Sequence, residues 1–218
     1  MGNDIFRSEL IKLRSLIDLI ELYDAMSEDS SEKNLRKVDS MYLFGVTSDN
    51  ENSTFISARK LLDKGLTERV LIDNMPPQNG FSGFSEWSKK LSELYGIHPQ
   101  GLDIDTSKGY NTLTEAESLV RYSSKENLNS LYLITPPFHL LRAFMTTSSV
   151  AIREDPGVNF FAYGGAEQDW NQVMEYHLWV TSRRIDSIKS EIERIKKYQA
   201  KGDIESTKKI MDYIVHRK

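Results

Sequence analysis

Residues 131–144 read LYLITPPFHLLRAF and contain a change from strand to helix. The run SLYLIT (130–135) is rich in apolar and β-favouring side chains, which is typical of a buried strand. Pro137 suits the first position of a helix, so a helix is predicted over FHLLRAFMTTS (138–148). His139 and Arg142 then lie three residues apart, on one face of that helix, directly after the strand.

The segments on either side repeat this alternation of strand and helix. Compact apolar runs predict strands over 40–47, 69–73, 101–105, 130–135 and 158–163. Apolar residues at helical spacing predict helices over 5–26, 53–65, 84–96, 111–123, 138–148, about 169–198 and 204–216. The alternation predicts the α/β class, with a mostly parallel sheet of about five strands that helices cover on both faces.

The chain length fits one domain over residues 1–218, with a core over 38–165. The material outside this core is helical and is expected over 1–30 and 169–218. Two interpretations of these terminal helices are equally open. They cover a face of the sheet, or they form a contact through which the chain makes a homo-oligomer.

Composition narrows the classes of function. The formal net charge of −4 disfavours a general nucleic-acid surface. Disulfides, thiolate metal sites and cysteine nucleophiles are excluded because the chain has no cysteine. Charged residues interrupt the N-terminal segment, and no apolar run approaches the ~20 residues that cross a bilayer. We therefore expect a cytoplasmic protein that binds neither nucleic acid nor membrane.

Ligands of parallel sheets bind beyond the carboxyl ends of the strands. Five segments should meet there, and all are rich in Gly, Asn, Ser, Thr and Pro: 45–53, 73–83, 105–115, 135–142 and 163–170. Their backbone amides and helix N-termini can hold an anion. From these segments we select Gly45, Thr47 and Thr135 as ligand-binding candidates.

His139 and Arg142 are the sharpest candidates for chemistry. A guanidinium binds a carboxylate or phosphate with two parallel hydrogen bonds, and an imidazole beside it can donate to the same anion or transfer a proton. The alternative is that Arg142 pairs with a carboxylate of the protein and His139 with a carbonyl. Asn111 and Thr112 are further polar candidates at a helix start, where a capping box from Thr112 to Glu115 is the competing explanation.

Other motifs are absent from the sequence. The four histidines are not at metal-binding spacing, and no metal site is predicted. There is no Walker loop, no GxGxxG after the first strand and no GxSxG elbow. The charged run RRIDSIKSEIERIKKYQAK (183–201) has the pattern of a solvated helix face.

Three motifs together resemble the DUF218 family, which includes YdcF-, SanA- and ElyC-like proteins. YLITPPFHLLRA (132–143) resembles that family's LVTSxFHMxRA signature, and NTLTEA (111–116) resembles its NTxENA helix start. SEWSKKLSELYGI (85–97) followed by DID (103–105) resembles the stretch before that helix, where Glu86 matches a recurrent glutamate. The order and spacing agree over 40–165.

The resemblance implies a Rossmann-like three-layer sandwich with a polar cleft at the strand ends. His139 and Arg142 would be the histidine and arginine of the cleft, Asn111 and Thr112 its paired polar residues, and Glu86 a further ligand-binding residue. The chain departs from the family where Thr114 and Glu115 replace Glu and Asn, and where GVTSDN (45–50) lacks a glycine cluster.

The expected function is binding of a small anionic or nucleotide-like ligand, either S-adenosylmethionine-like or phosphate-bearing. S-adenosylmethionine or a nucleotide is accordingly the implied cofactor. As an enzyme, the chain would be a transferase or hydrolase acting on a phosphate- or nucleotide-bearing small molecule. The alternative is a non-catalytic interaction module that uses the terminal helices.

Overall fold

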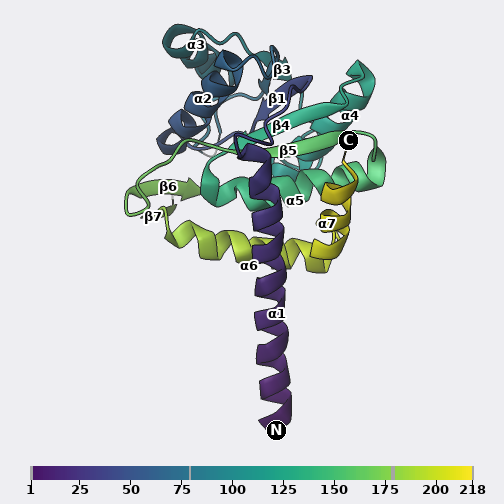
Figure 1. Ribbon diagram of the computed structural model, residues 1–218. Coiled ribbons are helices and arrows are strands. Elements are labelled where there is room, and N and C mark those ends of the chain that lie inside the picture. Colours follow the sequence, from purple (N-terminus) through teal and green to yellow (C-terminus); the bar gives the residue numbers. More distant parts are fainter. Residues whose placement is uncertain (1, 79, 178–179, 218) are drawn as a thin grey trace.

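A computed structural model describes residues 2–78, 80–177 and 180–217. Its middle layer is a five-stranded sheet in which every neighbouring pair is parallel, in the order β3-β2-β1-β4-β5 (Figure 1). The strands are β1 (Ser40–Leu43), β2 (Val70–Asp73), β3 (Gln100–Leu102), β4 (Ser130–Thr135) and β5 (Asn159–Gly164). The predicted α/β Rossmann-like three-layer sandwich is confirmed.

Helices form the outer layers because both faces of the sheet are apolar. Helices α2 (Ser48–Asp63) and α3 (Phe84–Tyr95) pack on one face, where Met41 and Leu43 of β1 join their core cluster. Helices α4 (Thr112–Glu126) and α5 (Pro137–Glu154) cover the opposite face, which receives Tyr42. The alternation of neighbouring strand side chains between two cores follows from the two-residue period of a β-strand.

The predicted strands and central helices are present, with shifted ends. The main shift is in α2, which begins at Ser48 rather than Ser53. Its N-cap is Thr47, which has an extended backbone, and acidic residues in the first turn favour the helix N-terminus there. Ser53 is instead a buried residue inside the helix, and its hydroxyl donates to the carbonyl of Ala166 at 2.6 Å.

The prediction of one helix over about 169–198 is wrong in its first half. That part forms an antiparallel hairpin of β6 (Val173–His177) and β7 (Val180–Arg183), and only then does α6 (Asp186–Lys201) begin. The segment VMEYH…VTSR contains β-branched and aromatic residues, which favour a strand over a helix. The fully buried Arg184 anchors the hairpin, because its Nε donates to Asn50 Oδ1 of α2 at 3.2 Å.

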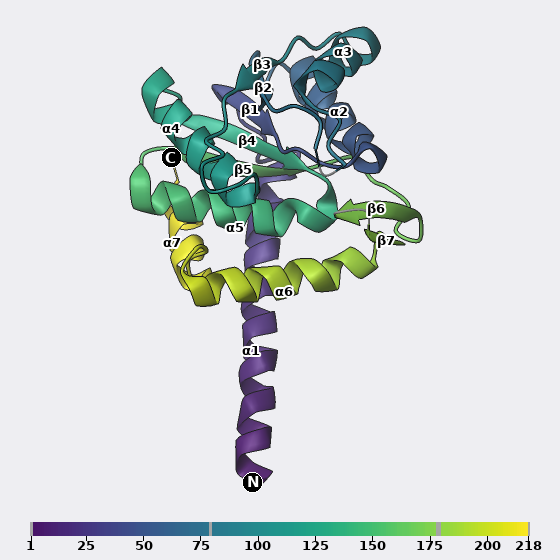
Figure 2. The ribbon, with the colours of Figure 1, turned by 180° about the vertical axis from the view of Figure 1, so that it is seen from behind.

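The C-terminal half of the first helix and the last helix of the chain meet beside β5. Helix α1 (Gly2–Ser27) packs its C-terminal half in the same core as α7 (Thr207–His216), and its N-terminal half extends away from the sheet (Figures 1 and 2). Arg217 follows α7 and pairs with Asp29 through Nη1–Oδ2 and Nη2–Oδ1 contacts of 2.8 and 2.9 Å. Within the described residues, no helix combines the length and the apolar character needed to span a bilayer.

The Asp29–Arg217 pair generates a prediction about stability. The two side chains are only 5% and 6% exposed, so Arg217→Ala leaves a buried carboxylate without its guanidinium. Losing one partner of a buried ion pair costs about 3–5 kcal/mol of unfolding free energy. Urea denaturation should show this loss, whereas Lys33→Ala, whose side chain is 75% exposed, should change stability by less than about 0.5 kcal/mol. Equal midpoints for the two variants would contradict the assignment.

Candidate functional site

A cavity of about 430 Å³ lies at the carboxyl ends of the strands. It sits where the chain order reverses, between β1 and β4, which is the usual ligand position in open α/β sheets. The loops after β1, β2 and β3 line it together with the first turns of α4 and α5, and α6 closes one side. Four of the five segments predicted from the sequence therefore reach one cavity, while 163–170 does not line it.

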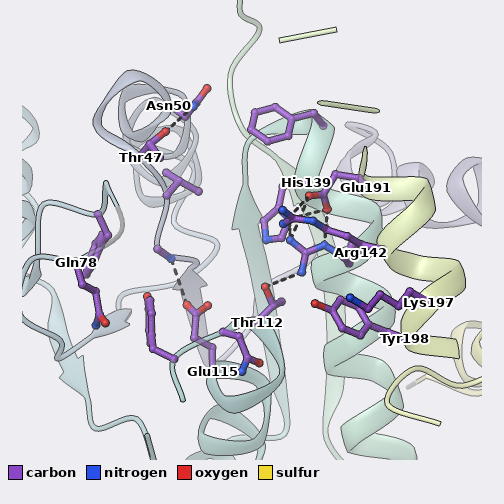
Figure 3. A pocket seen from close by; sticks show the side chains of 17 residues that line it. Thr47, Asn50, Gln78, Thr112, Glu115, His139, Arg142, Glu191, Lys197 and Tyr198 are labelled. Atoms are coloured by element: carbon purple, nitrogen blue, oxygen red, sulfur yellow. Dashed lines mark hydrogen bonds and ion pairs between the residues drawn. The ribbon is translucent and has the colours of Figure 1, made fainter. Parts of the chain in front are cut away.

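The structure brings His139 and Arg142 together at this cavity, joined by Glu191 of α6 (Figure 3). The Arg142 guanidinium donates through Nε to Glu191 Oε2 and through Nη2 to Oε1 at 3.2 Å. His139 Nδ1 lies 3.1 Å from the same Oε2 atom. All three side chains are less than a tenth exposed, so the cluster is a buried ion pair with a histidine attached.

Burial and charge set the protonation of this cluster. Burial lowers the pKa of His139, and the neighbouring Arg142 lowers that pKa further against the opposing effect of Glu191. Burial alone would raise the pKa of Glu191, but Arg142 and then His139 hold it well below its usual range. At neutral pH the cluster therefore consists of a guanidinium, a carboxylate and a neutral imidazole.

The neutral imidazole has one nitrogen that donates and one that accepts. Its Nδ1 lies 3.1 Å from both Glu191 Oε2 and Arg142 Nη2, and it satisfies only one of them at a time. With a proton on Nδ1 it donates to the carboxylate and leaves Nε2 as an acceptor. With a proton on Nε2 it accepts from the guanidinium. Each choice changes which nitrogen can transfer a proton.

Asn111 and Thr112 both line the cavity, and the structure corrects the capping prediction. Asn111 is the N-cap of α4: its Oδ1 accepts from the amide of Leu113 at 2.9 Å, and Thr114 completes the capping box. Thr112 is the first helical residue, and its Oγ1 accepts a 2.9 Å hydrogen bond from Arg142 Nη1. The cap lies one residue earlier than predicted, which leaves the Thr112 hydroxyl to position Arg142.

Glu115 was expected to close the capping box, but its carboxyl group lines the cavity instead. Its Oε1 accepts from the hydroxyl of Tyr42 at 3.0 Å and from the amide of Gly45 at 3.3 Å. Burial raises the pKa of Glu115 to about 8, with a further contribution from Asp73. Because Oε1 already accepts two hydrogen bonds, the proton of the neutral acid resides on Oε2.

Asp73 is the second buried acid, at the end of β2. Its Oδ2 accepts from the hydroxyl of Tyr110, and its Oδ1 from the amide of Met75 at 3.3 Å. Burial raises the pKa of Asp73 to about 6. Gly45 permits this close packing, since a Cβ atom there would lie 2.7 Å from Asp73 Oδ2 and 2.5 Å from the Tyr110 hydroxyl.

Two of the predicted ligand-binding residues lie outside the cavity, and a third lines it with its hydroxyl already engaged. Glu86 does not line the cavity; it lies in the first turn of α3, half exposed, and pairs with Lys90 at 2.7 Å. Thr135 is fully buried at the end of β4 and also does not line the cavity. Thr47 does line it, but its hydroxyl already donates to the carbonyl of Glu175 at 2.9 Å.

The residues that sequence reasoning missed come mainly from α6. Glu191, Arg194 and Lys197 line the cavity, although their segment has the pattern of a solvated face. They recur every three residues, which places them on a single helix face with Tyr198 beside them. This spacing was the available signal. The described residues contain no group of three or more His, Asp or Glu side chains arranged to hold a metal ion.

Fold and site define a Rossmann-like α/β sandwich with a polar, partly basic cleft at its topological switch point. A scan against protein-family models finds no match, and a search of curated proteins finds no similar sequence. Membership of the DUF218 family therefore stays a prediction that rests on the motifs around Asn111 and His139.

The raised pKa of Glu115 predicts a pH-dependent stability. Between its unfolded value of 4.5 and the folded value of about 8, the folded state keeps a proton that the unfolded state releases. This group therefore lowers stability as pH rises through that window. Glu115→Gln carries a neutral side chain at every pH, so its stability should not fall through this window. In urea denaturation, the free energy of unfolding of the variant should rise relative to that of the parent chain between pH 5 and pH 8. The expected rise is about 1.4 kcal/mol for each pH unit.

A matched control separates this effect from general charge removal. Glu126→Gln changes an exposed glutamate on the same helix, α4, and should shift stability equally at both pH values. Parallel pH profiles for the parent chain and Glu115→Gln would show that Glu115 ionises normally in the folded state.

Proposed function

We propose that the cavity binds a small, phosphate-bearing or nucleotide-like anion, and that Glu115 serves as its proton donor. The single observation that carries the proposal is the excess of cations in a cavity at the strand ends. Arg142, Arg194 and Lys197 line it, opposed by the ionised Glu191. Since Glu115 holds its proton at neutral pH, these ionised side chains leave two positive charges in excess.

Arg142 is already engaged, so the incoming anion meets the α6 cations first. The guanidinium donates to Glu191 and Thr112, which fixes its plane and position. Arg194 lies 3.8 Å from Glu191 and is half-buried. Lys197 is exposed, and no carboxylate of the described part of the chain pairs with it. Lys197 therefore supplies the charge that is most open to a ligand.

The aromatic residues that line the cavity suit an organic group attached to the anion. The rings of Phe81, Tyr110, Phe138 and Tyr198 lie around the cavity, and such surfaces hold a planar base by stacking. The volume of about 430 Å³ falls in the range of small-molecule sites. S-adenosylmethionine carries a sulfonium cation, so the excess positive charge favours a phosphate-bearing ligand over it.

Proton chemistry is the second part of the proposal. A neutral carboxylic acid at pH 7 donates a proton to a departing oxygen, and its raised pKa suits it to that role. The neutral His139 is the base on the other side of the cleft, and Glu191 orients its ring. An acid and a base across a cavity that binds phosphate are the elements of a hydrolase or a transferase.

A thermal-shift screen tests the binding step. The probes are inorganic phosphate, nucleoside mono- and diphosphates, sugar phosphates and S-adenosylmethionine. A ligand present at a hundred times its dissociation constant adds about 2.7 kcal/mol of stability, which moves the melting temperature measurably. We expect a phosphate-bearing probe to give the largest shift, and Lys197→Ala to weaken its binding about tenfold, the equivalent of ~1.4 kcal/mol.

Lys196→Ala is the matched control, because it removes the neighbouring exposed lysine of α6 that does not line the cavity. It should bind the probe as the parent chain does. The proposal fails if no phosphate-bearing probe shifts the melting temperature. It fails also if the two lysine variants lose affinity equally, since the attraction would then be a property of the whole helix surface.

A further inference from the structure

Helix α1 has two apolar faces, and the body of the protein uses only one of them. Leu19, Leu22 and Met26 are buried in the main core. Ile17 and Ile20 lie on the other side of the helix and are 48% and 52% exposed. A helix with a second apolar face directed away from its own core has surface left for another helix.

The second face continues toward the N-terminus with the spacing of a coiled coil. Phe6, Leu10, Leu13, Ile17 and Ile20 follow one another at intervals of four, three, four and three residues. At 100° per residue these positions fall within an arc of roughly 80°. This narrow stripe is the a/d seam of a heptad repeat, and the polar Asp24 ends it at the next a position.

The N-terminal half of α1 also needs a partner to be stable. Its backbone runs away from the sheet in both views (Figures 1 and 2), and Leu16, Ile17 and Ile20 are 38%, 48% and 52% exposed. A helix of fewer than about 12–15 residues is marginal in water without packing, and one slightly longer gains little. A partner surface outside its own chain would therefore stabilise this half of the helix.

The charges along α1 indicate that its partner is a second helix rather than a membrane. Residues 2–18 contain three acidic and three basic side chains, whereas a helix that lies on a membrane is rich in Lys and Arg. In the heptad, Glu9 is a g position and Arg14 the following e position. Two parallel copies of the helix in register bring each Glu9 to the Arg14 of the second copy, twice in the pair. An antiparallel pair aligned at Arg14 would bring Arg14 opposite Arg14 but Arg7 opposite Glu21, so the direction of the helices is tested separately by cross-linking.

We propose that α1 forms a parallel two-stranded coiled coil with α1 of a second copy of this chain, along the seam of Phe6, Leu10, Leu13, Ile17 and Ile20. The two bodies then lie on opposite sides of the coil, since each uses the Leu19 face. The strand-end cavity is not part of this contact, so the dimer and the proposed ligand site are independent. Helices α6 and α7 stay with their own chain, packed on α5.

Mass measurement by light scattering tests the dimer. The full chain should have twice its monomer mass of 25.1 kDa, and the double variant Ile17→Glu/Ile20→Glu should have the monomer mass. The matched control is Leu94→Glu on α3, which changes a 70% exposed leucine and should leave the dimer intact. A monomeric parent chain, a larger assembly, or binding of the monomer to anionic phospholipid vesicles would overturn the proposal.

Cross-linking tests the parallel arrangement, and the chain suits it because it has no cysteine. Ile20→Cys puts a thiol at a d position, which faces its own equivalent only when the helices run parallel. Mild oxidation should therefore convert most of this variant to a covalent dimer. Ser15→Cys, on the opposite side of α1, is the control and should cross-link at least tenfold more slowly. Equal rates for the two variants would exclude the parallel seam.

Discussion

The buried contact between Arg142 and Glu191 is the constraint on which the cleft depends. It ties α6, from the C-terminal part of the chain, to the first turns of α5 at the sheet edge. Both side chains are less than a tenth exposed, so separating them would leave an unpaired charge in the protein interior. The contact therefore holds α6 against α5 at one side of the cavity, and with it the positions of Arg194 and Lys197.

The sheet order explains why these groups meet at all. The chain builds β1, β2 and β3 in one direction, returns through α4 and adds β4 and β5 on the other side of β1. The helices that follow β3 and β4 consequently start side by side, which brings Thr112 of α4 within 2.9 Å of Arg142. The pleat of β1 directs Tyr42 to the same face, where its hydroxyl reaches Glu115.

The sequence around 131–144 was sufficient to predict a strand, a helix beginning near Pro137, and a shared face for His139 and Arg142. All of these depend on local spacing and turn chemistry. The partner of Arg142 could not be predicted in the same way, because Glu191 lies 49 residues further along the chain. The hairpin before α6 was missed since its strands are short, and contacts such as Arg184 with Asn50 determine their position.

Two classes of carboxyl group lie in the cavity or directly behind its lining, and their surroundings give them different pKa values. Glu191 faces two guanidinium groups and stays ionised, while Glu115 and Asp73 have tyrosine hydroxyls and backbone amides as partners. Hydrogen bonds from neutral donors offset less of the cost of burying a charge than a cation does, so the pKa values of Glu115 and Asp73 rise. If these acids served only for packing, apolar side chains in their place would make the folded state more stable. A neutral acid in a cavity lined by cations would suit the proton transfer to a bound anion that we propose.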